Sequence, residues 1–211
     1  MSSIDFKKAK YTLAAHYSHQ WPEDNGAEVA FAGRSNVGKS SAINVITNQN
    51  RLAKTSKTPG RTQQIVFFDV EEDIRLVDLP GYGYAKAPEA LRKHWQSFIS
   101  DYLFSRQCLR ALVIPMDIRR PLTALDLTML ECCWQTDLPA HVLLTKSDKF
   151  NRGKAINTLQ SVRKELKSAP LTSVQLFSSL KKEGVDEARS KLNELYRHQR
   201  KKEQNSPTDL R

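Results

Sequence analysis

The stretch VAFAGRSNVGKSS, residues 29–41, decides the fold. A β-rich run leads directly into a loop with the pattern Gly33-x-x-x-x-Gly38-Lys39-Ser40, and a helical pattern follows. Backbone N–H groups of such a loop converge on phosphate oxygens, and the positive end of the helix dipole adds to the attraction. A glycine turn with a surface lysine is the alternative, but it does not account for the strand and helix on either side. The sequence therefore predicts a phosphate-binding P-loop.

The residue types within this loop each suit a role in binding phosphate. We expect the N–H groups of residues 36–41 to bind phosphate oxygens. The Lys39 amine would neutralise the outer phosphates, and the Ser40 hydroxyl would ligate Mg²⁺. The predicted phosphate-binding residues are Gly33, Arg34, Ser35, Asn36, Val37, Gly38, Lys39, Ser40 and Ser41.

A second motif, DLPG at residues 78–81, ends a later strand pattern. The Asp78 carboxylate can hold Mg²⁺ through water, and the Gly81 N–H can bind a γ-phosphate. The tetrapeptide alone is weak evidence, but its position after the P-loop makes it strong evidence for a nucleotide site. It predicts a second switch segment made of Asp78, Leu79, Pro80 and Gly81.

The motif TKSD, residues 145–148, indicates which base is bound. At a strand end, Asp148 can accept from the ring N–H and the exocyclic amine of guanine, while the Lys146 stem lies across the ring. Adenine lacks this pair of donors, which disfavours an ATPase or kinase. A strand ending in a solvated Lys/Asp pair is the alternative. The later motif FSSLK places backbone groups where they can contact guanine O6. The predicted guanine-binding residues are Thr145, Lys146, Ser147, Asp148, Ser178, Ser179 and Leu180.

The alternation of strand and helix patterns predicts the fold class. We expect an α/β fold: a single P-loop GTPase domain with a mostly parallel six-stranded sheet, one antiparallel edge strand and helices on both faces. The predicted domain spans residues 26–198, after an N-terminal extension at 1–25 and before a disordered polar, basic tail at 199–211. The strand patterns occupy residues 27–33, 64–71, 74–80, 109–118, 140–147 and 173–180.

Composition limits the functional classes. The chain has 211 residues and a net charge of +10, an excess that attracts polyanions in general. No apolar run is long enough to span a bilayer or form a secretion signal, so we expect a cytoplasmic protein without a membrane partner. Three cysteines in apolar surroundings and five scattered histidines argue against a disulfide framework or a histidine-centred metal site. We expect a monomer.

The motifs GRSNVGKSS, SKTPGRTQ, DLPGYGYA, TKSD and FSSLK together resemble the EngB/YihA (YsxC) family of small bacterial GTPases, in the TrmE-Era-EngA-YihA-septin superfamily. The resemblance covers about residues 20–198. It implies binding of GTP and GDP, assembly of the large ribosomal subunit through that particle or its rRNA, and a role in cell division or septation. It also assigns Thr62 as a Mg²⁺ ligand, with Thr58 as the rival. The implied first switch comprises Gly60, Arg61, Thr62, Gln63 and Gln64.

Two departures from a generic GTPase affect the expected activity. Thr145 replaces the usual Asn of the base motif, so this loop must be tethered to the P-loop differently. Tyr82 stands where Ras-like enzymes carry a water-orienting Gln, so we expect slow intrinsic hydrolysis. Relatives in the superfamily use an Asn at the position of Asn36 to hold K⁺. Here Asn36 either holds K⁺ or merely hydrogen-bonds the loop.

The proposed mechanism is Mg²⁺-dependent hydrolysis of GTP by in-line attack of water, with two switch loops that change a binding surface. Basic residues after the base motif favour a ribosomal partner, although a solvated basic face explains a single cluster equally well. The basic residues of this cluster are Lys149, Arg152, Lys154, Arg163, Lys164 and Lys167. The rival is an interaction protein of the division machinery that uses GTP only as a state marker, without binding ribosomes.

Overall fold

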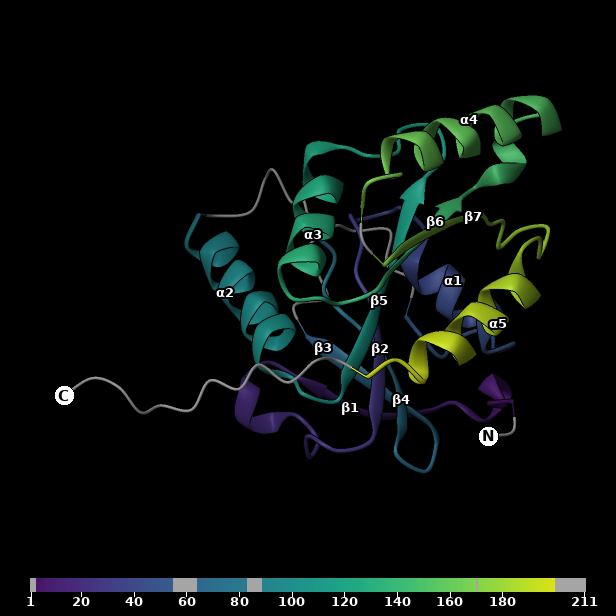
Figure 1. Cartoon of the computed structure of the whole chain (residues 1–211). Helices are drawn as coiled ribbons and strands as arrows, with labels where there is room; N and C mark the ends of the chain where they lie inside the picture. Colours follow the sequence, from purple (N-terminus) through teal and green to yellow (C-terminus); the bar gives the residue numbers. More distant parts are fainter. Residues whose placement is uncertain (1–2, 55–63, 83–88, 170, 200–211) are drawn as a thin grey trace.

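A computed structural model describes residues 3–54, 64–82, 89–169 and 171–199, with the backbone alone for 89–96. Seven strands and five α-helices lie within these ranges (Figure 1). The strands are β1 (Lys10–Ala15), β2 (Ala27–Phe31), β3 (Ile65–Glu71), β4 (Ile74–Asp78), β5 (Leu109–Asp117), β6 (Ala140–Thr145) and β7 (Thr172–Leu176). The helices are α1 (Lys39–Ile46), α2 (Glu89–Ser105), α3 (Ala124–Gln135), α4 (Arg152–Glu165) and α5 (Val185–Tyr196).

The strands form one sheet in the order β1-β3-β4-β2-β5-β6-β7. The five strands from β4 to β7 are parallel, while β3 is antiparallel to both β4 and β1. The α/β class, the mostly parallel sheet and the antiparallel β3–β4 hairpin are confirmed. Helices cover both faces, as predicted.

The predicted number of six strands is wrong, because β1 adds a seventh and replaces β3 at the edge of the sheet. This strand comes from residues 1–25, which the prediction treated as an extension outside the α/β pattern. Its first three residues are exposed, and only Ala15 is fully buried. An edge strand that buries so little apolar surface leaves a weak hydrophobic pattern in the sequence. Its partners in β3 also follow at a distance of 50 to 59 residues along the chain. The boundaries of the GTPase domain stay a prediction.

Two apolar clusters occupy the two faces of the sheet. One cluster packs α2, α3 and α4 against the sheet, through side chains such as Tyr102, Leu130 and Val162. The other packs α1 and α5 on the opposite face, with Ile43 and Leu192 among its members. Figure 1 shows α2 and α3 on one side of the central strands and α1 and α5 on the other. Burial of both faces explains why the central strands are nearly continuous apolar runs.

The parallel strands direct their carboxyl ends to the same edge of the sheet. The loops after β2, β4, β5, β6 and β7 therefore meet there, as expected for ligand sites of doubly wound sheets. Among the described residues, no helix is long and apolar enough to cross a membrane.

Candidate nucleotide-binding site

The predicted P-loop connects β2 to α1. Gly38 caps the helix with φ 101°, a left-handed conformation that favours glycine. At Gly33 a Cβ atom would lie 3.1 Å from the Pro115 carbonyl oxygen, so the loop passes close to β5. The two glycines of the motif are thus required by backbone conformation and by close packing.

The free amides of the loop lie mainly in the first turn of α1. Residues 39–41 occupy this turn, where backbone N–H groups have no partner within the helix. The Val37 N–H, by contrast, donates to the Arg34 carbonyl at 3.3 Å. That hydrogen bond closes the loop in this structure, and the contacts of residues 36–41 with phosphate stay a prediction.

Lys39 and Asp78 form an ion pair between the P-loop and the end of β4. The pairing follows from the sheet, because β2 and β4 are neighbours and Phe31 is in register with Asp78. Both side chains are largely buried. The ammonium and the carboxylate therefore neutralise each other in this structure. A phosphate bound to Lys39 and a Mg²⁺ ion bound near Asp78 would separate the pair.

The residues near this pair suit Mg²⁺. The Ser40 hydroxyl and the Asp78 carboxylate are hard oxygen donors, which Mg²⁺ prefers, and Ser40 follows directly after Lys39 in α1. The third predicted ligand, Thr62, lies outside the described residues, as do its rival Thr58 and residues 60–63 of the first switch. Of that switch only Gln64 is described, and its side-chain amide lies 2.8 Å from His16 Nε2.

The second switch motif leaves the sheet beside the P-loop. The Leu79 N–H donates to the Phe31 carbonyl at 3.0 Å and so continues the β2–β4 pairing. Asp78, Leu79, Pro80 and Gly81 are all buried. Tyr82 then pairs with the P-loop, since its N–H donates to the Gly33 carbonyl at 3.2 Å.

Thr145 tethers the base motif to the P-loop. Its Oγ1 donates to the Val37 carbonyl at 2.5 Å and lies 3.0 Å from the Met116 carbonyl. A threonine hydroxyl thus makes the connection for which the sequence offered no Asn. The side chain is almost wholly buried, which strengthens the hydrogen bond and raises the cost of losing it.

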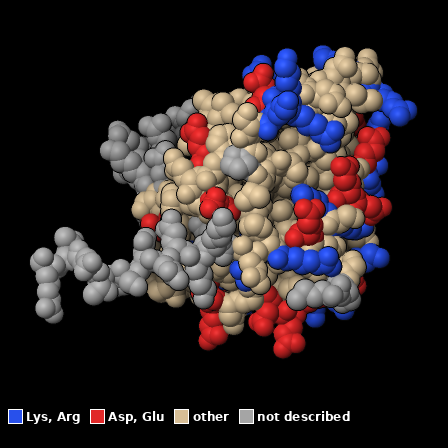
Figure 2. Space-filling model, in the orientation of Figure 1, with Lys and Arg blue, Asp and Glu red and all other residues tan. Residues whose placement is uncertain are grey.

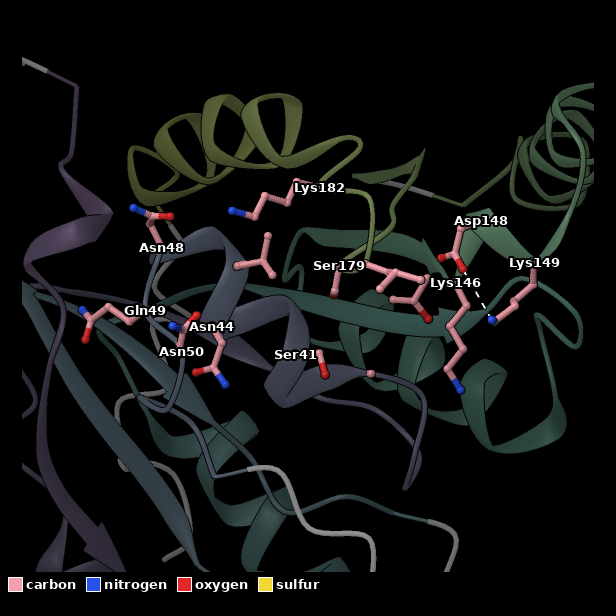
Figure 3. Close-up of a pocket in the computed structure, with 14 residues that line it drawn as sticks. Ser41, Asn44, Asn48, Gln49, Asn50, Lys146, Asp148, Lys149, Ser179 and Lys182 are labelled. Atoms are coloured by element: carbon pink, nitrogen blue, oxygen red, sulfur yellow. Dashed lines mark ion pairs between the residues drawn. The ribbon is translucent and has the colours of Figure 1, made fainter.

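The backbone conformation and the amine contacts of Lys146 fix the direction of its side chain. Its backbone is left-handed, with φ 58°, and its amine donates to the Asn36 carbonyl at 2.8 Å. The amine also pairs with Asp117 Oδ2 at 2.9 Å. This places the aliphatic stem along the pocket between the P-loop and Asp148 (Figure 3).

Asp148 is oriented by a residue of the next motif. The Ser178 hydroxyl donates to Asp148 Oδ1 at 2.6 Å, and this hydrogen bond is the main cause of a lowered Asp148 pKa. The Ser178 N–H instead donates to the Glu183 carbonyl at 3.0 Å. The Ser178 N–H thus has a partner within the loop, and the predicted backbone contact of residues 178–180 with guanine O6 stays a prediction.

A pocket of about 460 Å³ joins the P-loop helix to the base motifs (Figure 3). The predicted residues on its wall are Gly38, Ser41, Thr145, Lys146, Asp148, Ser179 and Leu180. Ser147 is not among the lining residues; it is buried behind the pocket, where its N–H donates to the Phe177 carbonyl at 3.2 Å. Further lining residues that the motifs did not predict are Asn44, Val45, Asn48, Gln49, Asn50, Lys149 and Lys182.

Asp117 is a site residue that the sequence analysis missed. It ends β5 and forms ion pairs with Arg119 at 2.6 Å and with Lys146 at 2.9 Å. Hydrogen bonds from Arg119, and then from Lys146, keep its pKa well below the usual range despite partial burial. An acidic residue at the carboxyl end of a parallel strand was the available signal.

Asn36, the candidate K⁺ ligand, has an exposed side chain and left-handed backbone with φ 64°. Its carbonyl accepts the bond from Lys146. Within the described part of the chain, its side-chain amide has no hydrogen-bond partner. The alternative in which this amide hydrogen-bonds the loop thus receives no support from these residues, and K⁺ binding stays a prediction.

Known proteins resemble this chain in sequence and in fold. The family model described as "50S ribosome-binding GTPase" matches residues 28–146. A probable GTP-binding protein EngB of Stenotrophomonas maltophilia is 57% identical over 189 residues, which cover 89% of this chain and 94% of the relative. The chain belongs to the EngB family. A second relative of that name, from Xanthomonas oryzae pv. oryzae, is 54% identical over 89% of this chain and 91% of its own.

The EngB fold is also found among solved structures. A crystal structure of a probable GTP-binding protein engB superposes with a TM-score of 0.66 at 21% identity, covering 81% of this chain and 99% of the other. This superposition shows a shared fold, and the identity to the EngB relatives confirms the family resemblance predicted from the motifs.

Proposed function

We propose that this chain is a Mg²⁺-dependent GTP switch that hydrolyses GTP slowly to GDP and phosphate. Hydrolysis of GTP accords with membership of this GTPase family. The observation that supports the nucleotide most directly is the pocket in which Asp148, fixed by Ser178, faces the first turn of α1. A carboxylate at one end and free amides at the other match guanine and phosphate, respectively.

Different side chains of the site bind the phosphates and Mg²⁺. Lys39 would turn from Asp78 to the outer phosphates. Ser40, and Asp78 through water, would hold Mg²⁺, with Thr62 as the proposed third ligand. When bound, Mg²⁺ neutralises charge on the phosphate oxygens. Intrinsic turnover is slow because Tyr82 stands at the position of the usual water-orienting Gln. A phenol has no amide with which to orient the attacking water molecule as that Gln does.

The proposed partner is the large ribosomal subunit or its rRNA, with normal division or septation depending on that assembly step. The protein would act in the cytoplasm as a monomer. The description of the matched family supports this partner. So does the surface of α4, which carries four basic residues and one acidic residue. Figure 2 shows Lys and Arg side chains gathered near α4, while Asp and Glu are concentrated elsewhere on this face.

Co-sedimentation tests this partner. Tagged protein in a lysate is centrifuged through a gradient with a non-hydrolysable GTP analogue or with GDP, at several salt concentrations. We expect association with large-subunit particles that depends on the nucleotide and weakens as salt rises. Absence from these particles in both nucleotide states would favour the division-machinery alternative.

A matched charge change locates the contact. In the variant with Arg152→Gln and Lys164→Gln, both changes lie on exposed positions of α4. We expect weaker association and a smaller salt dependence, by about one counterion for each lost phosphate contact. The control is the double variant Lys7→Gln and Lys8→Gln, at exposed positions near the opposite edge of the sheet, which removes the same number of charges. An equal loss in the control would mean that net charge, rather than this surface, governs binding.

A further inference from the structure

Asp126, in the first turn of α3, is a fully buried carboxylate close to the nucleotide site. Its Oδ2 accepts from the backbone N–H of Thr123 at 3.0 Å and from the Thr123 hydroxyl at 2.8 Å, which completes the helix cap. Its Oδ1 faces away from this cap, toward the P-loop. A buried charge is costly unless donors compensate it, so the groups that meet Oδ1 are important for the fold.

Two donors from different parts of the nucleotide site converge on Asp126 Oδ1. Arg34, the second residue of the P-loop motif, donates through Nε at 3.2 Å. The Tyr82 hydroxyl, immediately after the second switch motif, donates at 3.3 Å. Burial and the neighbouring Asp126 charge raise the pKa of Tyr82 well above its ordinary value, so the phenol keeps its proton and donates.

The same two residues are joined through their backbones. Arg34 and Tyr82 form a parallel β-bridge, in which the Tyr82 N–H donates to the Gly33 carbonyl. The Ser35 N–H donates to the Tyr82 carbonyl, and both hydrogen bonds measure 3.2 Å. The P-loop, the end of the second switch motif and α3 therefore meet at one carboxylate.

Groups that would bind a triphosphate with Mg²⁺ lie in the segment that carries Tyr82. The Lys39 amine contacts Asp78 in this structure, and a triphosphate with Mg²⁺ would draw the two apart. Gly81, the neighbour of Tyr82, must also direct its N–H to the γ-phosphate in that state. Asp78 and Tyr82 are only four residues apart, so a shift of this segment toward the phosphate acts against the Tyr82 contacts.

We propose that Asp126 is a positioning residue of the GTPase site, whose hydrogen bond with Tyr82 holds the second switch in the conformation that lacks γ-phosphate contacts. The proposal rests on the proposed function of GTP binding. A triphosphate must break or stretch this hydrogen bond, while GDP leaves it intact. The bond therefore lowers the affinity for GTP relative to GDP, and α3 senses the change.

The test removes one hydroxyl. Tyr82→Phe keeps the ring and deletes the donor, and Asp126 retains Arg34 and Thr123 as partners. We expect GDP affinity within twofold of the wild type, and a ratio of GTP-analogue to GDP affinity that rises about three- to tenfold. Fluorescent-nucleotide titrations with Mg²⁺ measure both affinities. Asp126→Asn, which weakens the same bond while keeping the side-chain volume, should raise the ratio as well.

A second buried tyrosine provides the matched control. The Tyr102 hydroxyl donates to the buried Glu28 Oε2 at 2.7 Å, beside Arg106, at the opposite end of β2 from the P-loop. Tyr102→Phe removes the same kind of hydrogen bond and should lower stability without changing the affinity ratio. A change of ratio in both variants would indicate a general effect of destabilisation and would overturn the proposal.

The remaining outcomes are distinct. An unchanged or lowered ratio in Tyr82→Phe, with normal nucleotide binding by the wild type, contradicts the positioning role and leaves the proposed function intact. Failure of the wild-type protein to bind either guanine nucleotide contradicts both.

Discussion

The hydroxyl of Thr145 donates to the backbone carbonyl of Val37 at 2.5 Å and thereby joins the end of β6 to the P-loop. This one hydrogen bond couples the segment proposed to bind the base to the segment proposed to bind phosphate. Because both groups are buried, neither has water as a substitute partner.

Thr145→Val should uncouple the two segments, since valine matches the shape of threonine but lacks the hydroxyl. We expect a loss of about 1 to 3 kcal/mol in the free energy of unfolding, because a buried carbonyl loses its donor. GDP affinity should fall about tenfold as the base loop shifts relative to the P-loop. Denaturant unfolding and nucleotide titration measure the two effects. Thr145→Ser, which keeps the hydroxyl, should retain most of the affinity; equal losses in both variants would count against this tether.

Ser178→Ala tests how Asp148 is held. Loss of the 2.6 Å hydrogen bond frees the carboxylate and removes the main cause of its lowered pKa, so the Asp148 pKa should rise. We expect GDP affinity to fall about five- to thirtyfold, consistent with loss of one charge-assisted hydrogen bond. The matched control is Ser173→Ala on β7, where the hydroxyl contacts His141 instead. Unaltered GDP binding in Ser178→Ala would remove this residue from the base site.

His141 makes stability depend on pH. Burial is the main reason that the pKa of His141 is lowered to about 4. The hydrogen bond with Gln175 and the charge of Glu194 raise this pKa, and the charge of Lys191 lowers it further. The unfolded chain, with a histidine pKa of about 6.5, binds a proton that the folded chain rejects. Stability is therefore complete above about pH 6.5 and is lost as the pH falls toward 4, by up to about 3 kcal/mol.

The variant His141→Asn isolates this effect. Its free energy of unfolding, compared with the wild type from pH 7 to pH 4, should show a difference that shrinks with acid, because the variant lacks the titrating ring. The control His19→Asn changes an exposed histidine. Parallel pH profiles for wild type and His141→Asn would show that this histidine does not set the acid sensitivity.

K⁺ dependence tests the proposed role of Asn36. If its amide helps to hold a monovalent cation near the phosphates, K⁺ places positive charge where an arginine finger does so in other GTPases. Hydrolysis should then be faster in K⁺ than in Na⁺ at equal ionic strength, with choline as the inert reference. Asn36→Ala should abolish this difference while largely keeping GDP affinity. Equal rates in K⁺ and Na⁺, with and without the ribosomal partner, would contradict the cation site.

The sequence predicted those features that depend on local pattern. Gly33, Gly38 and Lys39 stand at fixed spacing between a strand pattern and a helix pattern. Asp148 follows a buried strand pattern. Both patterns can be recognised in a single sequence. The β-α alternation likewise predicted the parallel sheet and its covered faces. The positions of these residues at one sheet edge followed from that topology.

Features that depend on distant partners were not predictable in this way. Strand β1 pairs with residues of β3 that lie 50 to 59 positions later in the sequence, and it buries little apolar surface of its own. Asp126 looks like an ordinary helix cap until the fold brings Arg34 and Tyr82 to its second oxygen. The hydrogen bond from the Ser178 hydroxyl to Asp148 was likewise not predicted, because it joins residues 30 positions apart in the sequence.

The measurement that tests guanine recognition most directly is the nucleotide preference of Asp148→Asn. The amide donates where the carboxylate accepted, so GTP affinity should fall by roughly 1 to 3 kcal/mol and XTP should become the preferred ligand. Asp186→Asn, an exposed acid in the first turn of α5, is the control and should leave the preference for GTP unchanged. Competition titrations of both variants with GTP and XTP give the answer. A switch to XTP in Asp148→Asn alone is the predicted result, whereas undiminished GTP affinity in that variant would contradict the account.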